Sequence, residues 1–446
     1  MKSKLFITVM ISVLTLTCVM FTGQVKVSSR ARFQSQSQSQ PAGLCDNSNR
    51  PFGDVKVLAQ VPYPGYPEGN AVEGDKVYIA GAVAPYSSKG QDVHFPNPTE
   101  QSMLFEFNKC TGQLLRQFAV NKNQLPINPR AVSHVAFDGR GRAYVPEFQD
   151  GIFRLELDNQ NTQQLYATRF PDLPPCPGGV VVPGVACSPT LTDERPIMNE
   201  MAFDARGNLY VSDSNQATIW IVRPRGPLPR QAEIYFRSSR FDAEGGFGPN
   251  GLRISPDGKK IYIAISDDGV TPRGARAGIY TIPLVNHPEN LSEADLKLFH
   301  LYPANDLPDG IAFGKSGLLY VALLNPASPP PTGFLVPPGY RLPVGPFFGG
   351  GLSILRRNGT EKTRITDQTM FDSPACVSFD GFGSVLLTNH AFLTGNRLKM
   401  QVLNVFVDDK ESPLFKPNLD RGNGSNGNDG NSDDDDNGED DDDDGR

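Results

Sequence analysis

The chain has 446 residues, of which 38% are hydrophobic and 20% are charged, and its formal net charge is −7 at pH 7. The segment from Asp429 to Arg446 holds eleven acidic residues and one arginine, so the rest of the chain has 41 basic and 38 acidic residues, a net charge of +3. A nearly neutral body without a basic stripe argues against nucleic-acid binding. The length suffices for two or three average domains or for one long repeat architecture.

Residues 1–23 have the pattern of a secretory signal peptide. Lys2 and Lys4 precede a 17-residue apolar run from Leu5 to Phe21, and polar Gln/Ser-rich sequence follows it. The run is shorter than the roughly 20 residues of a membrane-spanning helix, and no other segment is apolar enough to span a bilayer. We expect a secreted, extracellular protein in which residues 24–51 form a flexible N-terminal segment. An uncleaved signal anchor stays open as the alternative, because no clean small-x-small cleavage site follows Phe21.

Six stretches of the chain repeat one pattern. MNEMAFDARGNLYVSDS, PNGLRISPDGKKIYIAIS and PDGIAFGKSGLLYVALL are the clearest copies, and SHVAFDGRGRAYVPEF, SPACVSFDGFGSVLLTNH and EGNAVEGDKVYIAG fit the same frame. Each copy opens with a short apolar strand, turns at a glycine and returns as an alternating strand, which is typical of a β-hairpin. A second pair of strands follows in several copies, as in ATIWIVRP and GIYTIPL. Six copies of four strands predict an all-β fold, a six-bladed β-propeller over residues 52–415.

The two ends of the repeat region predict how the ring closes. A strand at residues 54–61 precedes the first copy, whereas the last copy has only three strands and ends in MQVLNVFV. We expect the N-terminal strand to complete the last blade, which removes a sheet edge. Residues 416–446 are expected to be a disordered acidic tail, because GNGSNGNDGNSDDDDNGEDDDDDGR contains no apolar residue to bury.

Five cysteines remain after residue 23. Cys176 and Cys187 flank a short loop of glycine, proline and valine and are expected to form a local disulfide. Cys376 lies in an apolar strand pattern and is expected to be a buried free thiol. Cys45 and Cys110 remain as the second candidate disulfide.

One position of the repeat, which we call the slot, carries side-chain oxygens in most copies. The slot residues are, in chain order, Glu68, Ser133, Asn199, Asn250, Asp309 and Ala375, at intervals of 65, 66, 51, 59 and 66 residues. Equivalent positions of a propeller meet around its axis. Four of these residues therefore predict a cation site, and oxygen-only ligands favour Ca²⁺, Mg²⁺ or Mn²⁺ over Zn²⁺. The alternative is that Asn-Gly and Asp-Gly are only turn residues, which does not explain why the oxygens recur in register.

With these motifs the chain resembles the SMP-30/gluconolactonase/LRE-like family, six-bladed propellers related to paraoxonases and to the squid-type phosphotriesterase. The resemblance covers about residues 52–415 and rests on PEGNAV, IMNEMAFD, PNGLRISPDG and LPDGIAFG, which supply Glu68, Asn199, Asn250 and Asp309. PEGNAV departs from the family pattern because it lacks the Pro and Trp that often follow. The resemblance implies one catalytic divalent cation held by these four residues. Ca²⁺ is the first candidate, and Mg²⁺, Mn²⁺ or Zn²⁺ are the alternatives. It also implies hydrolysis of a lactone or, as in relatives, of an aryl ester or a phosphotriester.

The reaction implied is metal-assisted attack of water on a lactone carbonyl. Asp309 is the first candidate to orient and deprotonate the water or to attack directly, although a carboxylate bound to a cation is a weak base. His134 is the second catalytic candidate, because paraoxonases use a histidine of the second blade. Ser133 occupies the slot there, however, and adjacent strand residues point to opposite faces, so His134 is expected to pack between blades.

Loops at the rim nearest the slot are expected to select a small-molecule substrate. They cover residues 82–101, 171–196, 266–278, 325–350 and 389–396, and their candidate substrate-binding residues are His94, Arg273, Arg276 and His390. The sequence thus predicts a secreted, monomeric, cation-dependent lactonase. The alternative is a non-catalytic binding propeller with a structural cation, since NHL-type propellers share the phrase AFDARGNLYVSDSNQATIWIV.

Overall fold

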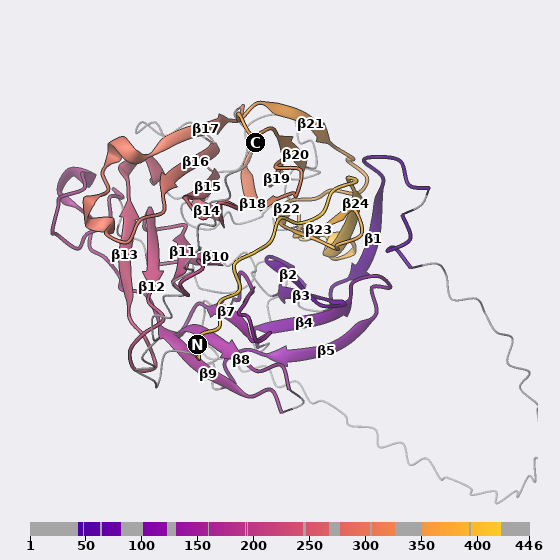
Figure 1. Ribbon diagram of the computed structural model, residues 1–446, viewed down its shortest axis with the longest axis horizontal. Helices are drawn as coiled ribbons and strands as arrows, with labels where there is room; N and C mark the ends of the chain where they lie inside the picture. Colours follow the sequence, from indigo (N-terminus) through magenta and orange to yellow (C-terminus); the bar gives the residue numbers. More distant parts are fainter. Residues whose placement is uncertain are drawn as a thin grey trace, which may run out of the picture. The chain divides into compact units, whose positions relative to one another are not determined.

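The computed structural model describes residues 43–47, 49–62, 65–81, 101–122, 131–158, 160–191, 193, 195–243, 247–266, 277–303, 306–325, 350–391 and 394–420. These residues form six antiparallel sheets of four strands each, arranged as a ring (Figure 1). The predicted six-bladed β-propeller is therefore confirmed. Within the described part of the chain, no helix has the length and apolar character needed to cross a membrane.

Blades one to five are each built from four consecutive strands. Blade one has β2 (Asn70–Glu73), β3 (Lys76–Gly81), β4 (Met103–Asn108) and β5 (Leu114–Ala119), and blade two has β6 (Ala136–Phe137), β7 (Ala143–Glu147), β8 (Gly151–Leu155) and β9 (Gln163–Thr168). Blade three has β10 (Met198–Phe203), β11 (Leu209–Asp213), β12 (Thr218–Val222) and β13 (Ala232–Arg237). Blade four has β14 (Phe247–Ile254), β15 (Lys260–Ser266), β16 (Gly278–Pro283) and β17 (Lys297–Leu301), and blade five has β18 (Pro308–Phe313), β19 (Leu319–Leu323), β20 (Gly351–Leu355) and β21 (Glu361–Ile365). The helical elements among the described residues are short 3₁₀ turns at Pro177–Gly179, Ser239–Phe241, Pro288–Asn290, Glu293–Asp295 and Arg397–Lys399.

Blade six joins the two ends of the ring. It consists of β22 (Pro374–Phe379), β23 (Ser384–Asn389), β24 (Gln401–Phe406) and the N-terminal strand β1 (Val55–Gln60). β1 pairs antiparallel with β24, from Val55 opposite Val405 to Gln60 opposite Gln401. The predicted closure of the ring by the N-terminal strand is confirmed, and it covers an edge of β24 that would otherwise expose unpaired backbone groups.

An aspartate sets the first hairpin of several blades. In blade three, Asp204 Oδ1 accepts hydrogen bonds from the backbone N–H groups of Arg206 at 2.8 Å and Asn208 at 2.9 Å. Gly207 adopts a φ of +88°, which a residue with a side chain rarely adopts. Asp138 in blade two and Asp380 in blade six hold their turns in the same way. The recurring Phe-Asp-x-x-Gly motif thus fixes where the second strand begins and keeps the innermost strands in register around the axis.

The core lies between blades rather than under one sheet. Each pair of neighbouring blades encloses its own cluster of buried apolar side chains, such as Tyr210 of blade three with Ile261 of blade four. Each fully buried side chain of this size stabilises the fold by about 1.5–3 kcal/mol. The blades are therefore held as a ring, and the innermost strands become a rigid support for the axis.

The residues before β1 are held by a disulfide and by a buried arginine. Cys45 is bonded to Cys110 in the β4–β5 hairpin of blade one, and Arg50 donates to Asp54 and to Asn404 of blade six. Residues 43–47 and 49–51, which the sequence places in a flexible segment, therefore contact the first and last blades. Cys176 is bonded to Cys187, and Cys376 is free and buried, as predicted.

Removing the two disulfides is expected to have unequal effects on stability. The Cys45–Cys110 bond closes 65 residues and the Cys176–Cys187 bond closes 11. A single disulfide typically adds about 2–4 kcal/mol to the free energy of unfolding. Because loop-closure entropy grows with loop length, the Cys45–Cys110 bond should add about 1.5 kcal/mol more than the shorter one. Urea unfolding of Cys45→Ser/Cys110→Ser should therefore show the larger loss of free energy, with Cys176→Ser/Cys187→Ser as the matched control. Equal losses from the two double variants would contradict this prediction.

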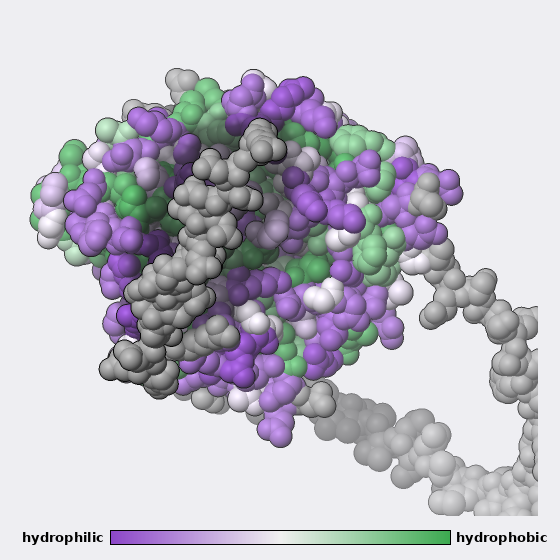
Figure 2. Space-filling model, in the orientation of Figure 1, coloured by the Kyte–Doolittle hydropathy of each residue, from purple (hydrophilic) through white to green (hydrophobic). Residues whose placement is uncertain are grey.

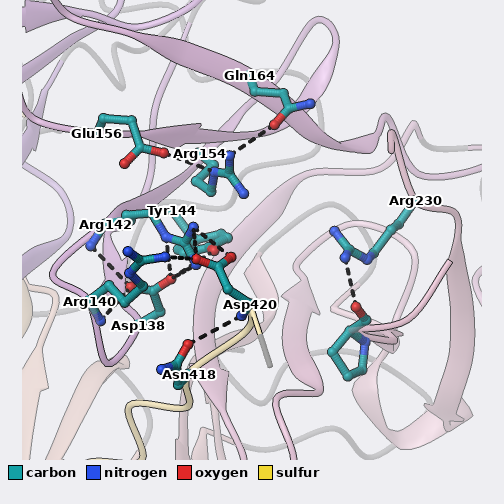
Figure 3. Close-up of polar contacts among 11 residues, drawn as sticks. Asp138, Arg140, Arg142, Tyr144, Arg154, Glu156, Gln164, Arg230, Asn418 and Asp420 are labelled. Atoms are coloured by element: carbon teal, nitrogen blue, oxygen red, sulfur yellow. Dashed lines mark hydrogen bonds and ion pairs between the residues drawn. The ribbon is translucent and has the colours of Figure 1, made fainter. Parts of the chain in front are cut away.

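A C-terminal strap, which we define as residues 407–420, crosses one face of the ring; its yellow ribbon is seen in Figure 1. Ser412 donates its backbone N–H to Phe313 at 2.8 Å in blade five, and Gly139 of blade two donates to Pro417 at 2.9 Å. Lys416 forms an ion pair with Glu73 of blade one, and Asp420 accepts from Arg142 at 2.9 Å (Figure 3). Residues 416–420, which the sequence assigns to a disordered tail, are thus held by charges on blades one and two. Where this face is coloured in Figure 2, hydrophilic and hydrophobic residues are interspersed.

Candidate metal centre on the propeller axis

β-bulges interrupt the innermost strands at the slot. The pairing of these strands skips from Met198 to Met201 in blade three, from Pro249 to Leu252 in blade four, from Pro308 to Ile311 in blade five and from Pro374 to Val377 in blade six. In each skip lie the slot residue and the residue after it. A bulge breaks the strict alternation of side chains, so two consecutive residues can face the same side. The axis therefore carries two layers, the slot layer and a second layer formed by the residue after each slot.

Contacts between neighbouring blades bring the slot residues into one ring. Ser133 Oγ lies 2.9 Å from the carbonyl oxygen of Asn199, and a Cβ on Gly251 would lie 2.1 Å from the carbonyl oxygen of Asp309. On the other side of the ring, Thr388 of blade six donates to the carbonyl oxygen of Glu68. Residues separated by up to 241 positions, Glu68 and Asp309, are close enough for their charges to interact. The structure thus brings the predicted ligands to one end of the axis.

Two amide side chains present oxygen atoms that have no partner in the described part of the chain. Asn199 donates its Nδ2 to Ser214 Oγ at 3.1 Å, and Asn250 donates its Nδ2 to Ser266 Oγ at 3.0 Å. The Oδ1 atoms of both asparagines are buried and accept no hydrogen bond from the described residues. A buried oxygen without a partner costs about 1–3 kcal/mol of stability. An external ligand that accepts lone pairs, such as a cation, would remove this cost.

The two slot carboxylates are buried close to each other. Glu68 is 9% exposed and Asp309 is 3% exposed. Burial raises the pKa of Glu68 to about 8, and the charge of Glu200 adds to the effect. The pKa of Asp309 is raised well above its usual range by burial, then by the charges of Glu68 and Glu200. Two buried carboxylates that repel each other, beside two unpartnered amide oxygens, fit a divalent cation with oxygen ligands.

His390 lies beside the slot layer. Its ring is buried, and Nε2 is 3.5 Å from Glu68 Oε2. The ring centroid is 5.7 Å from that of Tyr66. His390 follows β23, and blade six brings it next to Glu68 of blade one, although 322 residues separate the two in sequence. The other substrate-binding candidates, His94, Arg273 and Arg276, lie outside the described residues.

The expectation that His134 packs between blades is corrected by the structure. A ring nitrogen of His134, a carboxylate oxygen of Glu200 and Sγ of Cys376 all lie within 4.8 Å of one another. The three residues come from blades two, three and six. His134 is therefore on the axis, in the second layer, because strand alternation does not hold next to the slot. Burial and then the charge of Arg253 lower its pKa well below the usual value, so the ring is neutral. Ser133, in the slot itself, donates its hydroxyl to the carbonyl oxygen of Met198 at an Oγ–O distance of 2.7 Å.

Two serines that the sequence analysis did not single out orient the slot amides. Ser214 Oγ accepts from Asn199 and donates to the carbonyl oxygen of Pro249 at 2.9 Å; Ser266 Oγ accepts from Asn250 and donates to the carbonyl oxygen of Pro308. Each serine therefore turns the amide of its own blade and contacts the next blade. A recurrent signal was present, because both lie at the end of the second strand of their copies, in NLYVSDS and KIYIAIS.

Ser266→Ala is expected to weaken cation binding about 10-fold or more, since residues that orient metal ligands affect affinity by about 10- to 100-fold. Without the hydroxyl, the Asn250 amide is free to rotate its oxygen away from the axis. Calorimetric titration of chelator-stripped protein with Ca²⁺ measures the effect. Ser255→Ala is the matched control, because the Ser255 hydroxyl bonds to Asp257 and to N–H groups of the β14–β15 turn. Unchanged affinity in Ser266→Ala would show that the Asn250 amide does not depend on this contact.

No family model and no curated protein sequence matches the chain. Among solved structures, the calcium-binding protein regucalcin from Agrobacterium tumefaciens shares 14% identity, with 82% of this chain and 96% of that chain covered and a TM-score of 0.50. A luciferin-regenerating enzyme shares 13% identity, with 82% and 99% covered and a TM-score of 0.51. A gluconolactonase from Xanthomonas campestris shares 12% identity, with 79% and 89% covered and a TM-score of 0.46. At these identities the first two comparisons show that the chain shares the fold of those proteins, and function must be argued from the site.

Proposed function

We propose that this chain is a divalent-cation-dependent hydrolase of the SMP-30/gluconolactonase/LRE-like family, acting on a lactone or a related ester. The observation that carries the proposal is the slot layer. Two buried carboxylates, Glu68 and Asp309, lie with two buried amide oxygens, of Asn199 and Asn250, that accept no hydrogen bond from the described residues. In a scaffold that binds no ligand, these four groups would only destabilise the fold, because each buried polar group without a partner has an energetic cost. Ca²⁺ is the first candidate, since all four ligands are oxygens.

The four slot residues would hold the cation, and its positive charge, when bound, would polarise the lactone carbonyl. Asn199 and Asn250 offer their Oδ1 atoms, and the serines behind them keep these oxygens directed toward the axis. The closed contacts between blades fix the positions of the ligands in advance, so little reorganisation is needed during the reaction.

Asp309 is our candidate for taking the proton of the attacking water. Of the two carboxylates, Glu68 already has His390 Nε2 at 3.5 Å, whereas the described residues give Asp309 no such side-chain contact. Water oxygen adds to the carbonyl carbon while its proton passes to Asp309. The ring C–O bond then breaks, and the proton returns from Asp309 to the ring oxygen. The product is a hydroxy acid, and the carboxylate is restored.

The location and partners that we propose rest on the pattern of residues 1–23, on the two disulfides and on the charge of the propeller body. Residues 1–23 would direct export and be removed, and the two disulfides suit an oxidising compartment. The partner would be a small-molecule substrate, bound by a monomer, and the near-neutral body argues against nucleic acid.

The test is hydrolysis of a panel of lactones, aryl esters and phosphotriesters by chelator-stripped protein, with Ca²⁺, Mg²⁺, Mn²⁺ or Zn²⁺ added back. We expect turnover of a lactone, restored by one cation. Turnover of aryl esters or phosphotriesters alone would keep the site and change the substrate class. No turnover with any cation, on protein shown to be folded, would favour a non-catalytic binding propeller.

A further inference from the structure

The second layer of the axis contains three side chains and three glycines. His134, Glu200 and Cys376 are each 2% exposed. The remaining positions are Gly69, Gly251 and Gly310, and a Cβ on Gly310 would lie 2.7 Å from Glu200 Oε1 and 2.5 Å from Cys376 Cα. The glycines thus leave the centre of the ring to the imidazole, the carboxylate and the thiol.

The three side chains are unequally satisfied. Glu200 Oε2 accepts from the backbone N–H of Leu252 at 2.8 Å and from Arg253 at 3.3 Å, and Cys376 Sγ donates to Glu200 Oε1 at 3.1 Å. His134 is different, because neither of its ring nitrogens has a partner among the described residues. A neutral imidazole has one N–H and one lone pair, and a buried ring that uses neither is costly. Among the described residues its lone pair has no donor, and a ring nitrogen lies within 4.8 Å of a thiol and a carboxylate.

We propose that His134, Glu200 and Cys376 form a second metal site, for a thiophilic divalent cation of the zinc class. Nitrogen, oxygen and sulfur ligands together suit Zn²⁺, whereas Ca²⁺ and Mg²⁺ take oxygen ligands. The site shares no residue with the slot layer and does not depend on the hydrolase proposal. Because each ligand comes from a different blade, one ion would join blades two, three and six at the axis and stabilise the ring.

Binding of an ion would release a proton from the site, beside the ion pair of Arg253 with Glu200. On binding, the Cys376 S–H bond breaks, its proton leaves to solvent and a metal–sulfur bond forms. Arg253 also fixes Glu200, as residues behind metal ligands commonly do.

A cavity lies between His134 and the C-terminal strap. A cavity of about 60 Å³ is lined by His134, Arg253 and Asn70 from the propeller and by Glu411 and Phe415 from the C-terminal strap. Asn70 Oδ1 is buried and has no partner among the described residues, which makes it a candidate fourth ligand or a partner for a metal-bound water. The lining residues Asn70, Arg253 and Ser378 follow the slot by two or three positions, so this cavity lies on the side of the second layer away from the slot.

Cobalt titration of the chelator-stripped, full-length chain tests the proposal. A thiolate bound to Co²⁺ gives a charge-transfer absorption that oxygen ligands do not give, and Cys376 is the one free cysteine of the described residues. We expect this band to saturate at one Co²⁺ per chain, to be removed by Zn²⁺ and to survive excess Ca²⁺. Zn²⁺ should also raise the melting temperature of the stripped protein.

Variants separate this site from the slot. Cys376→Ser is expected to abolish the charge-transfer band and the stabilisation by Zn²⁺, and His134→Gln to weaken Co²⁺ binding about 10-fold or more. Asn250→Ala, the matched control in the slot layer, should keep the band. If Cys376→Ser fails to fold, the Co²⁺ titration of the wild-type protein still tests whether a thiolate site is present. Absence of the band in folded wild-type protein, or its survival in folded Cys376→Ser, would overturn the proposal.

Discussion

Asp309→Asn is expected to lower cation-dependent lactone hydrolysis by about 10²-fold or more while the fold is retained, in the range of single-residue effects on general acid–base catalysis. The substitution keeps the size of the side chain but removes its negative charge and its ability to take a proton. The fold should tolerate it, because asparagine already occupies the slot in blades three and four, and loss of the charge relieves repulsion with Glu68. The measurement is kcat and KM of both proteins at saturating cation.

Saturating cation separates the two contributions of Asp309. A variant that only binds the ion more weakly should recover its rate as the cation concentration rises, whereas a variant that has lost the proton acceptor should not. Asp257→Asn, the same change on an exposed carboxylate in the β14–β15 turn, is the matched control and should keep wild-type rates. Wild-type turnover by Asp309→Asn at saturating cation would remove Asp309 from the mechanism.

The stability of the chelated protein is expected to fall as the pH rises from about 4.5 through about 8, and bound cation should remove most of this dependence. Burial raises the pKa of Glu68 to about 8 from an ordinary value of 4.5, and the pKa of Asp309 moves in the same direction. Between these values the folded chain holds protons that the unfolded chain has released. The free energy of unfolding therefore decreases with pH, by about 1.4 kcal/mol per pH unit for each such proton.

Urea unfolding across this pH range, with chelator and with saturating Ca²⁺, measures the effect. Other buried carboxyl groups contribute slopes of the same sign, since burial raises the pKa of Asp213 to about 6 and that of Glu411 to about 7. Their contribution is common to both conditions, so the difference between the two slopes belongs to the slot. Glu68→Gln/Asp309→Asn should abolish that difference. Equal slopes with and without Ca²⁺ in the wild-type protein would contradict the prediction.

The blades and their closure could be predicted because the evidence recurs. Asp204 and Gly207 set a hairpin in one copy, and Asp138 and Asp380 reappear in the same place in others, so the repeat frame is fixed several times over. The strand at 54–61 could be assigned to the last blade because only that blade lacked a fourth strand. The slot residues share this frame, and it is the frame that brings Glu68 and Asp309 together.

The place of His134 could not be predicted, because the rule used for it fails locally. Side chains alternate along a regular strand, but the bulges at the slot turn Glu200 and Cys376 toward the axis beside Asn199 and Ala375. A bulge cannot be predicted from the residue at a single position of the sequence. It does show that the residue after the slot is either glycine or one of His, Glu and Cys in all six copies, which is a signal of a crowded axis.

Contacts between distant segments were equally hidden. His390 ends a strand of the last blade, and only ring closure brings it to Glu68 of the first. The C-terminal strap has no strand periodicity, and it is held by turn residues of other blades, such as Gly139 and Arg142. Such contacts depend on the finished ring and leave no local pattern in the strap.

Equilibrium binding of Ca²⁺ to the chelator-stripped chain and to Asn199→Ala/Asn250→Ala tests the slot most directly, because it needs no substrate. Both proteins must give the spectrum of the folded propeller. We predict that the wild-type chain binds one Ca²⁺ with high affinity and that the double variant loses this binding. Absence of Ca²⁺ binding to the wild-type chain, or undiminished binding to the double variant, would contradict the assignment of these residues as cation ligands.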